Sequence, residues 1–170
     1  MEYFVYITND CNLHCEYCSV LLDCKKIGLP LKPVYSNDLL SKFIEQTQKQ
    51  YKDSEIKIYF FGGEPSLECS EIENLISDVN AKLSKQFTIK FVLHTNGLLL
   101  NDLSQKIIDS LNLIMFSINY EKIPKFNLST GYFSNIMKGI MKIKDETKIP
   151  VIARLTITEQ TSLYTEILQV

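Results

Sequence analysis

The stretch YFVYITNDCNLHCEYC, residues 3–18, joins a strand-like run to a tight loop that carries three cysteines. Cys11, Cys15 and Cys18 follow the spacing C-x3-C-x2-C. Three thiolates on one such loop can hold three irons of a [4Fe–4S] cluster and leave the fourth iron without a protein ligand. An open coordination position distinguishes a reactive metal centre from a structural one. The loop therefore predicts a reactive iron–sulfur site directly after the first strand.

Two other interpretations of the cysteine loop stay open at this point. A structural zinc ion would accept the three thiolates together with His14 or Cys24. Alternatively, the cysteines are reduced thiols that bind no metal. Cys24 and Cys69 are the other two cysteines of the chain. We expect both to be ordinary thiols, because two cysteines cannot ligate a further cluster by themselves.

The composition is that of an ordinary globular domain. Of the 170 residues, 45% are hydrophobic and 22% are charged, and the formal net charge is −2. This charge gives no electrostatic reason to expect nucleic acid or an anionic membrane as a partner. No run approaches the ~20 apolar residues of a membrane span, and no secretory signal pattern is visible. We therefore expect a cytoplasmic, reducing location, where cysteines bind metal or catalyse before they form disulfides.

Strand and helix patterns alternate along the whole chain. Runs rich in β-branched and aromatic residues predict strands at 3–8, 56–61, 88–94, 113–119 and 151–158. Apolar periodicity predicts helices at 39–51, 70–85, 102–111 and 132–146, and a fifth from Ser162. Ser70 followed by Glu73 resembles a capping box for the second of these helices. Five βα units in series predict an α/β fold with a parallel sheet, wound as a barrel or as an open doubly wound sheet.

The loops after the predicted strands carry the motifs. Because the carboxyl ends of parallel strands meet at one edge, we expect these loops to build one site. Gly62, Gly63 and Glu64 follow the second strand. Two glycines let the backbone approach a ligand closely and offer exposed amides and carbonyls, although an ordinary βα turn is the alternative interpretation.

The third strand ends in His94 and the segment TNG, residues 95–97. An Asn-Gly pair readily adopts a turn, so this segment either forms a turn or lines the site. His94 is one of two histidines in the chain and could carry a proton. We expect instead a strand residue whose ring is satisfied by neighbouring backbone, because the sequence offers it no acidic partner.

Polar residues also end the fourth and fifth predicted strands. Period-two alternation puts Met115, Ser117 and Asn119 on one face of the fourth, which fits a ligand-facing mouth. Arg154, on the fifth, is the only arginine among 18 basic residues and shares a face with Thr156. Its planar fork binds a carboxylate through two parallel hydrogen bonds, which lysine cannot reproduce. An exposed arginine at the end of a strand is the alternative.

Taken in order, CxxxCxxC, GGEP, TNG, SIN and ARLTIT resemble the radical S-adenosylmethionine (radical SAM) superfamily over essentially the whole chain. The string TNDCNLHCEYC is most similar to the SPASM-type branch of peptide and protein maturases, such as the anaerobic sulfatase-maturing enzymes. The resemblance implies one core domain over residues 1–170, folded as a partial TIM-like barrel of about five βα units. The family barrel usually has six such units and this branch a cysteine-rich C-terminal extension, so we expect a domain that is incomplete at its C-terminus.

The resemblance also implies a chemistry and a set of site residues. The cofactors would be a [4Fe–4S] cluster and S-adenosylmethionine, with an electron donor such as flavodoxin or ferredoxin. Reductive cleavage would yield a 5′-deoxyadenosyl radical that takes a hydrogen atom from a substrate, here a peptide or protein. The implied residues are the cluster ligands Cys11, Cys15 and Cys18 and the cofactor contacts Gly62, Gly63, Glu64, Ser117 and Arg154.

Two functions of other classes remain as alternatives. The family commonly has an Asp where this chain has Asn119, which keeps a hydrogen-bonding group but loses the charge. Together with the short chain, this substitution motivates a non-catalytic or degenerate iron–sulfur protein. A zinc-stabilised α/β binding module is the second alternative. No residue of the sequence stands out as a general acid or base.

Overall fold

The fold is a parallel five-stranded sheet with helices packed against it. The computed structural model describes residues 1–13, 15, 18, 20, 26–118 and 131–156. The strands are β1 (Glu2–Thr8), β2 (Glu55–Gly62), β3 (Thr88–Thr95), β4 (Leu111–Ile118) and β5 (Val151–Leu155). The helices are α2 (Asn37–Tyr51), α3 (Cys69–Leu83), α4 (Gln105–Ser110) and α5 (Gly131–Glu146), with short 3₁₀ helices η1 (Pro65–Glu68) and η2 (Leu100–Asp102).

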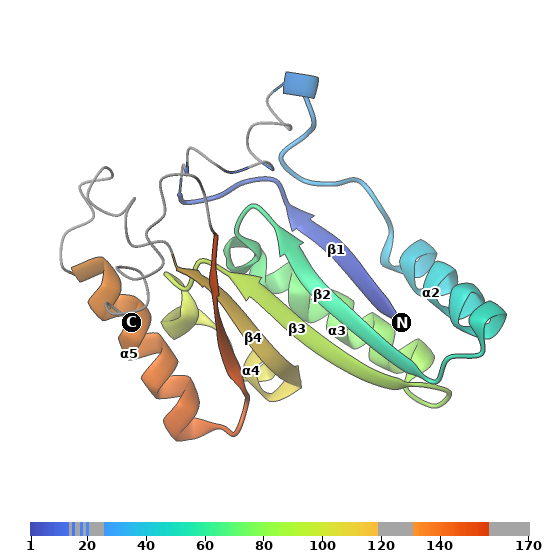
Figure 1. Ribbon diagram of the computed structural model, residues 1–170. Coiled ribbons are helices and arrows are strands. Elements are labelled where there is room, and N and C mark those ends of the chain that lie inside the picture. Colours follow the sequence, from blue (N-terminus) through green and yellow to red (C-terminus); the bar gives the residue numbers. More distant parts are fainter. Residues whose placement is uncertain (14, 16–17, 19, 21–25, 119–130, 157–170) are drawn as a thin grey trace.

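The strand order distinguishes between a barrel and an open doubly wound sheet, the two arrangements that the sequence left open. The strands pair in chain order, β1-β2-β3-β4-β5, and every pair is parallel. A doubly wound sheet would reverse direction at a switch point, whereas a sheet that adds each new strand beside the last is a sector of a barrel. In Figure 1, α3 and α4 lie behind the sheet, and α2 and α5 flank them on either side. The α/β class and a parallel five-stranded sheet of barrel-like order are therefore confirmed. The fifth helix, expected from Ser162, lies outside the described residues.

One hydrophobic core lies between the helices and one face of the sheet. It contains alternate strand residues and the inner helix faces, including Val5, Ile58, Phe60, Leu93, Ile114, Ile72, Leu75, Ile107 and Ile136. Strand side chains alternate between the two faces, so every second residue enters this core. Burial of each such side chain contributes about 1.5–3 kcal/mol relative to its exposure in water. The core fixes the register of the strands and thereby aligns their carboxyl ends.

The start of α3 corrects one expectation from the sequence. Ser70 lies inside the helix rather than at its cap, because η1 leads directly into α3 at Cys69. The Glu73 carboxylate accepts a hydrogen bond from Ser104 Oγ at 2.5 Å, instead of turning back to its own helix. The capping box predicted from Ser70 and Glu73 is therefore wrong. A tertiary partner, the N-cap residue Ser104 of α4, takes the place of the local one.

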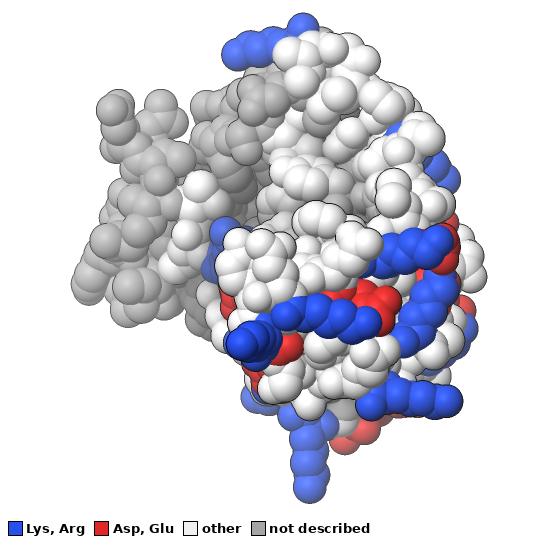
Figure 2. Space-filling model, turned by 90° about the vertical axis from the view of Figure 1, so that its right-hand side faces the viewer, with Lys and Arg blue, Asp and Glu red and all other residues white. Residues whose placement is uncertain are grey.

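Charges of both signs are interleaved on the face shown in Figure 2, where lysine side chains lie beside acidic ones. Ion pairs of this kind link α2 to α3, for example Lys82 with Asp38 at 3.0 Å, and join strands, for example Lys90 with Glu55 at 2.6 Å. Opposite charges on this face thus neutralise each other locally instead of forming a patch of one sign. Within the described residues, no helix has the length and apolar character needed to cross a membrane.

Candidate functional site

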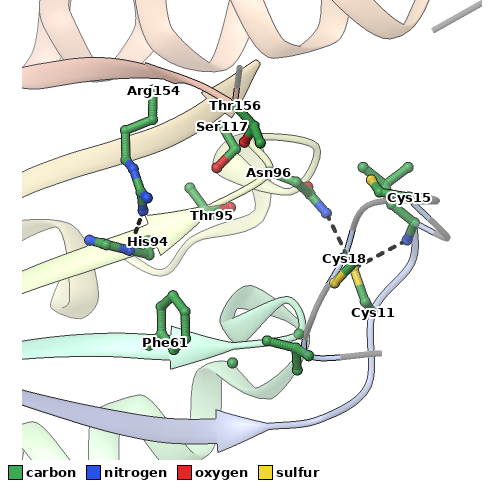
Figure 3. Close-up of a pocket in the computed structure, with 14 residues that line it drawn as sticks. Cys11, Cys15, Cys18, Phe61, His94, Thr95, Asn96, Ser117, Arg154 and Thr156 are labelled. Carbon is green, nitrogen blue, oxygen red and sulfur yellow. Dashed lines mark hydrogen bonds between the residues drawn. The ribbon is translucent and has the colours of Figure 1, made fainter. Parts of the chain in front are cut away.

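A cavity of about 270 Å³ opens at the carboxyl ends of the strands. Seven of the eight site residues predicted from the sequence line it: Cys11, Cys15, Cys18, Gly62, Gly63, Ser117 and Arg154. Figure 3 shows the cysteine side chains at one end of this cavity and Arg154 at the other. The parallel sheet brings together side chains that are more than a hundred residues apart in the sequence. The prediction that the segments at the carboxyl ends of the strands lie around one site is thus confirmed.

The three cysteines are half-exposed thiols on the loop that follows β1. The loop turns back on itself, because Cys18 N donates to Cys15 O at 3.1 Å. The Cys11 sulfur accepts a hydrogen bond from Leu13 N at 3.3 Å. Burial raises the pKa of the Cys11 thiol to about 11, and the charges of Glu64, Cys15 and Cys18 add to this effect. Binding of a metal centre to this sulfur would therefore release a proton.

Three thiols at one cavity are a donor set that suits an iron–sulfur cluster. In the described part of the chain, no group of three or more His, Cys, Asp and Glu side chains is arranged to hold one metal ion. A [4Fe–4S] cluster presents its irons at separate corners, so its thiolate ligands surround a larger space than the ligands of one ion. Three thiols around one cavity match that requirement. The zinc interpretation depends on His14 or Cys24, which both lie outside the described residues.

The Gly62-Gly63 turn packs backbone against backbone on the start of the cysteine loop. Gly63 N donates to Thr8 O at 2.7 Å, and Glu64 N donates to Asp10 O at 2.8 Å. Gly62 has a φ of +134°, and a Cβ there would lie 2.1 Å from Thr8 O. A Cβ on Gly63 would lie 2.0 Å from Asp10 O. The close backbone approach predicted from the two glycines is thus made to the chain itself, at the wall of the cavity.

Replacement of Gly63 with alanine should displace this turn. The added methyl group would overlap a backbone oxygen that has no room to move, and such overpacking typically destabilises by about 1–3 kcal/mol. Urea unfolding should show this loss, and iron bound after reconstitution should fall with it. Gly28→Ala is the control for backbone strain without a clash, since Gly28 has a φ of +67° but nothing lies within 4 Å of the added Cβ. It should keep the iron content of the wild type. Wild-type stability and iron content in Gly63→Ala would contradict this account.

The Glu64 side chain points into the protein and does not line the cavity. It is fully buried, and its carboxylate accepts hydrogen bonds from both Ser66 N, at 3.1 Å, and Ser66 Oγ. It also accepts from Thr95 Oγ1 at 2.8 Å and from Asn96 N at 2.6 Å. Glu64 therefore ties the turn after β2 to the end of β3. Sequence reasoning missed this role, although a hydroxyl two residues after the glutamate was the available signal.

Asn96 fulfils both roles left open for the TNG segment. Its Oδ1 accepts from Leu98 N at 3.0 Å, which closes a turn. Its Nδ2 donates to Asn12 Oδ1 at 2.7 Å and lies 3.9 Å from the Cys11 sulfur (Figure 3). Asn96 is a site-lining residue that sequence reasoning left undecided. Its contact with the cysteine loop spans 85 residues, which no local pattern can reveal.

Among the described residues, the His94 ring contacts two side chains rather than backbone, which corrects the expectation from the sequence. Arg154 donates through Nη1 to His94 Nδ1 at 3.1 Å (Figure 3), and His94 Nε2 lies 3.0 Å from Met115 Sδ. A guanidinium has no acceptor, so Nδ1 must be the unprotonated nitrogen and Nε2 carries the hydrogen. Burial, and then the charge of Arg154, lower the pKa of His94 to about 4. The ring is therefore neutral at pH 7.

The lowered pKa of His94 predicts a pH dependence of stability. The pKa of His94 is about 4 in the folded chain, whereas in the unfolded chain it has the ordinary histidine value of 6.5. Between these values the unfolded chain binds more protons, so the free energy of unfolding should fall as the pH drops through this window. Urea unfolding at about pH 7.5 and about pH 5 should show a larger loss for the wild type than for His94→Gln. A proton NMR titration midpoint near 6.5 for the His94 ring would contradict this assignment.

Ser117 and Arg154 are adjacent across the β4–β5 pair, where the two residues are register partners. Both side chains are exposed and line the cavity together with Thr156, as the alternation along the two strands predicted. Among the described residues, the hydrogen-bond partner of the Arg154 guanidinium is the neutral His94 ring, not a carboxylate. Asn119, expected on the same face, lies outside the described residues.

Comparison with known proteins gives a consistent result. A family model described as the radical SAM superfamily matches residues 5–159. The chain is 31% identical over 157 residues to a probable GTP 3′,8-cyclase of Methanocaldococcus jannaschii, covering 86% of this chain and 46% of the relative. It is 27% identical over 140 residues to a serine-type anaerobic sulfatase-maturating enzyme of Bacteroides thetaiotaomicron, covering 79% of this chain and 34% of the relative.

Solved structures share the fold. Native anSMEcpe with bound AdoMet and Cp18Cys peptide is similar at a TM-score of 0.68 and 18% identity, covering 99% of this chain and 47% of that chain. Native anSMEcpe with bound AdoMet is similar at a TM-score of 0.69 and 18% identity, covering 99% of this chain and 48% of that chain. The chain thus spans less than half the length of the relatives and solved chains that it matches.

Proposed function

This chain belongs to the radical SAM superfamily, and we propose that it binds a [4Fe–4S] cluster and S-adenosylmethionine in the cavity at its strand ends. When bound, the pair supplies reductive cleavage of the cofactor to methionine and a 5′-deoxyadenosyl radical, which abstracts a hydrogen atom from the substrate. One observation carries the proposal. The three cysteines of the loop after β1 and the chain's single arginine, on β5, line the same cavity.

The cysteine loop is the proposed cluster site. The thiolates of Cys11, Cys15 and Cys18 would each bind one iron and leave the fourth iron open to the cofactor. The Leu13 amide already donates to the Cys11 sulfur, so the loop backbone is arranged to stabilise negative charge there. The Gly62-Gly63 turn holds the base of this loop through its hydrogen bond to Thr8.

The rest of the cavity wall is the proposed binding site for the methionine end of the cofactor. The backbone of Gly62 and Gly63 faces the cavity without side chains and can reach the amino group. Arg154 donates one N–H to His94, and its other N–H groups remain available to bind a carboxylate. Ser117, its neighbour across the strands, can add a hydroxyl donor. The Glu64 side chain contributes to this wall indirectly, by fixing the turn that it follows.

We propose a peptide or protein as the substrate and a small electron carrier, such as flavodoxin or ferredoxin, as the reductant. The similarity to a sulfatase-maturating enzyme supports a peptide, and the similarity to a probable GTP 3′,8-cyclase raises a nucleotide as the competing class. Among the described residues, Arg154 is the one cationic side chain on the cavity wall. Within the described residues, an arginine already used for the cofactor leaves no second cation on this wall for a triphosphate, which favours the peptide.

Electron paramagnetic resonance tests the proposal directly. The 170-residue chain would be reconstituted anaerobically, reduced with dithionite, and measured before and after addition of S-adenosylmethionine. A [4Fe–4S]⁺ signal that changes shape, accompanied by 5′-deoxyadenosine, is the expected result. A cluster signal whose shape does not change when S-adenosylmethionine is added would instead identify a non-catalytic or degenerate iron–sulfur protein. Zinc without iron or sulfide in the folded chain would identify a zinc-stabilised module.

A further inference from the structure

Asn96 lies between the cysteine loop and the buried Glu64 carboxylate. On one side its backbone N–H donates to Glu64 at 2.6 Å, and on the other its side-chain amide lies 3.9 Å from the Cys11 sulfur. Figure 3 shows the amide directed from the end of β3 toward the cysteines. The contact joins the segments that follow β1 and β3, two strands that are separated by β2 in the sheet.

The orientation of the Asn96 amide is determined by its partners. Its Oδ1 accepts from the Leu98 backbone N–H at 3.0 Å, so this end must be the oxygen. The other end, Nδ2, meets Asn12 Oδ1 at 2.7 Å, which can only accept there. The group that faces the Cys11 sulfur is therefore a donor. This assignment follows from the hydrogen-bond network, not from the shape of the side chain.

Glu64 holds Asn96 in this position. The carboxylate is fully buried and binds the TNG segment at two points, through Thr95 Oγ1 and through Asn96 N. Thr95 Oγ1 in turn accepts from Gly97 N at 3.0 Å, so the whole turn is tied to one carboxylate. Rotation of the Asn96 amide away from the cysteines would break its bonds to both Leu98 and Asn12.

We propose that Asn96 is a second hydrogen-bond donor to the Cys11 sulfur and that it raises the reduction potential of the cluster held there. The inference rests on the proposed function. Leu13 N is the first donor, at 3.3 Å. Donors to a ligating thiolate stabilise the extra electron of the reduced cluster, and hydrogen bonds to the sulfurs are an established control of cluster potential. The Asn96 donor is the one of the two that a side-chain substitution removes.

A potentiometric titration of the reconstituted chain, followed by the [4Fe–4S]⁺ signal, tests this role. Asn96→Ala removes both ends of the amide, whereas Asn96→Asp keeps an oxygen for Leu98 N and replaces the donor. We expect both variants to be harder to reduce by about tenfold in the equilibrium constant, which is ~59 mV for one electron. Asn101→Ala is the matched control. Its amide donates to Asn135 O at 3.5 Å, away from the cysteine loop, and its potential should equal that of the wild type.

Pulsed EPR after exchange into deuterium oxide separates a donor from a merely structural residue. The backbone N–H of Leu13 should give an exchangeable deuteron coupling in every variant. The wild type and Asn101→Ala should show a second exchangeable coupling, from Asn96, that both Asn96 variants lack. Wild-type potentials in both Asn96 variants, or the same two exchangeable couplings in the variants as in the wild type, would overturn the inference while leaving the proposed function intact. Failure of the wild-type chain to assemble any cluster would overturn both together.

Discussion

Cys11→Ala is expected to abolish the cluster signal and the formation of 5′-deoxyadenosine. Cys15 and Cys18 would then hold only two iron corners, and the cavity wall offers no other thiol among the described residues. Loss of a partner in the outer shell of a metal site typically costs 10–100-fold in affinity or activity, so loss of a ligand should exceed about 100-fold. Iron and sulfide analysis after anaerobic reconstitution, with the EPR signal, measures the result.

Cys69→Ala is the matched control for the cysteine variants. Cys69 begins α3 and donates through Sγ to Ser66 O at 3.2 Å. It does not line the cavity, so its replacement should leave the cluster signal at the wild-type level. A full cluster in Cys11→Ala would contradict the assignment of the ligands. In that case Cys24 would be the candidate for the third cluster ligand.

Glu64→Ala is expected to lower the free energy of unfolding by about 3 kcal/mol or more. The substitution leaves four donors around a buried cavity without their acceptor: Ser66 N, Ser66 Oγ, Thr95 Oγ1 and Asn96 N. Each unsatisfied buried donor costs about 1–3 kcal/mol. Glu64→Gln keeps one acceptor oxygen and should lose less. Urea unfolding followed by circular dichroism gives the comparison.

The neighbouring Glu68 provides the control for Glu64. It lies in η1, and its carboxylate pairs at 2.8 Å with the exposed Lys32. Surface substitutions of this kind usually change stability by less than about 0.5 kcal/mol, so Glu68→Gln should unfold with the wild type. Equal stability of Glu64→Ala and Glu68→Gln would show that the Glu64 network contributes nothing to the fold.

Local sequence patterns were sufficient to predict the strands of the sheet and the position of the site at their carboxyl ends. Each predicted strand exists within one or two residues of its bounds wherever the chain is described, because alternation with period two is a property of adjacent residues. The element ends were less predictable. The helix expected at 102–111 is confined to Gln105–Ser110, and Leu111 already begins β4. Competing tertiary contacts decide such boundaries, as the displaced capping box of α3 also shows.

The sequence alone established an α/β chain whose cysteine loop, glycine turn, TNG segment and single arginine all follow strands. Parallel strands put such segments at one edge whatever their spacing along the chain. The fold then determined which atoms meet there. Glu64 turned inward to Asn96, 32 residues away, and Arg154 reached His94 across 60 residues. Contacts of that range depend on strand order and on the competition for buried hydrogen bonds. The periodicity of a single segment predicts neither the strand order nor the outcome of this competition.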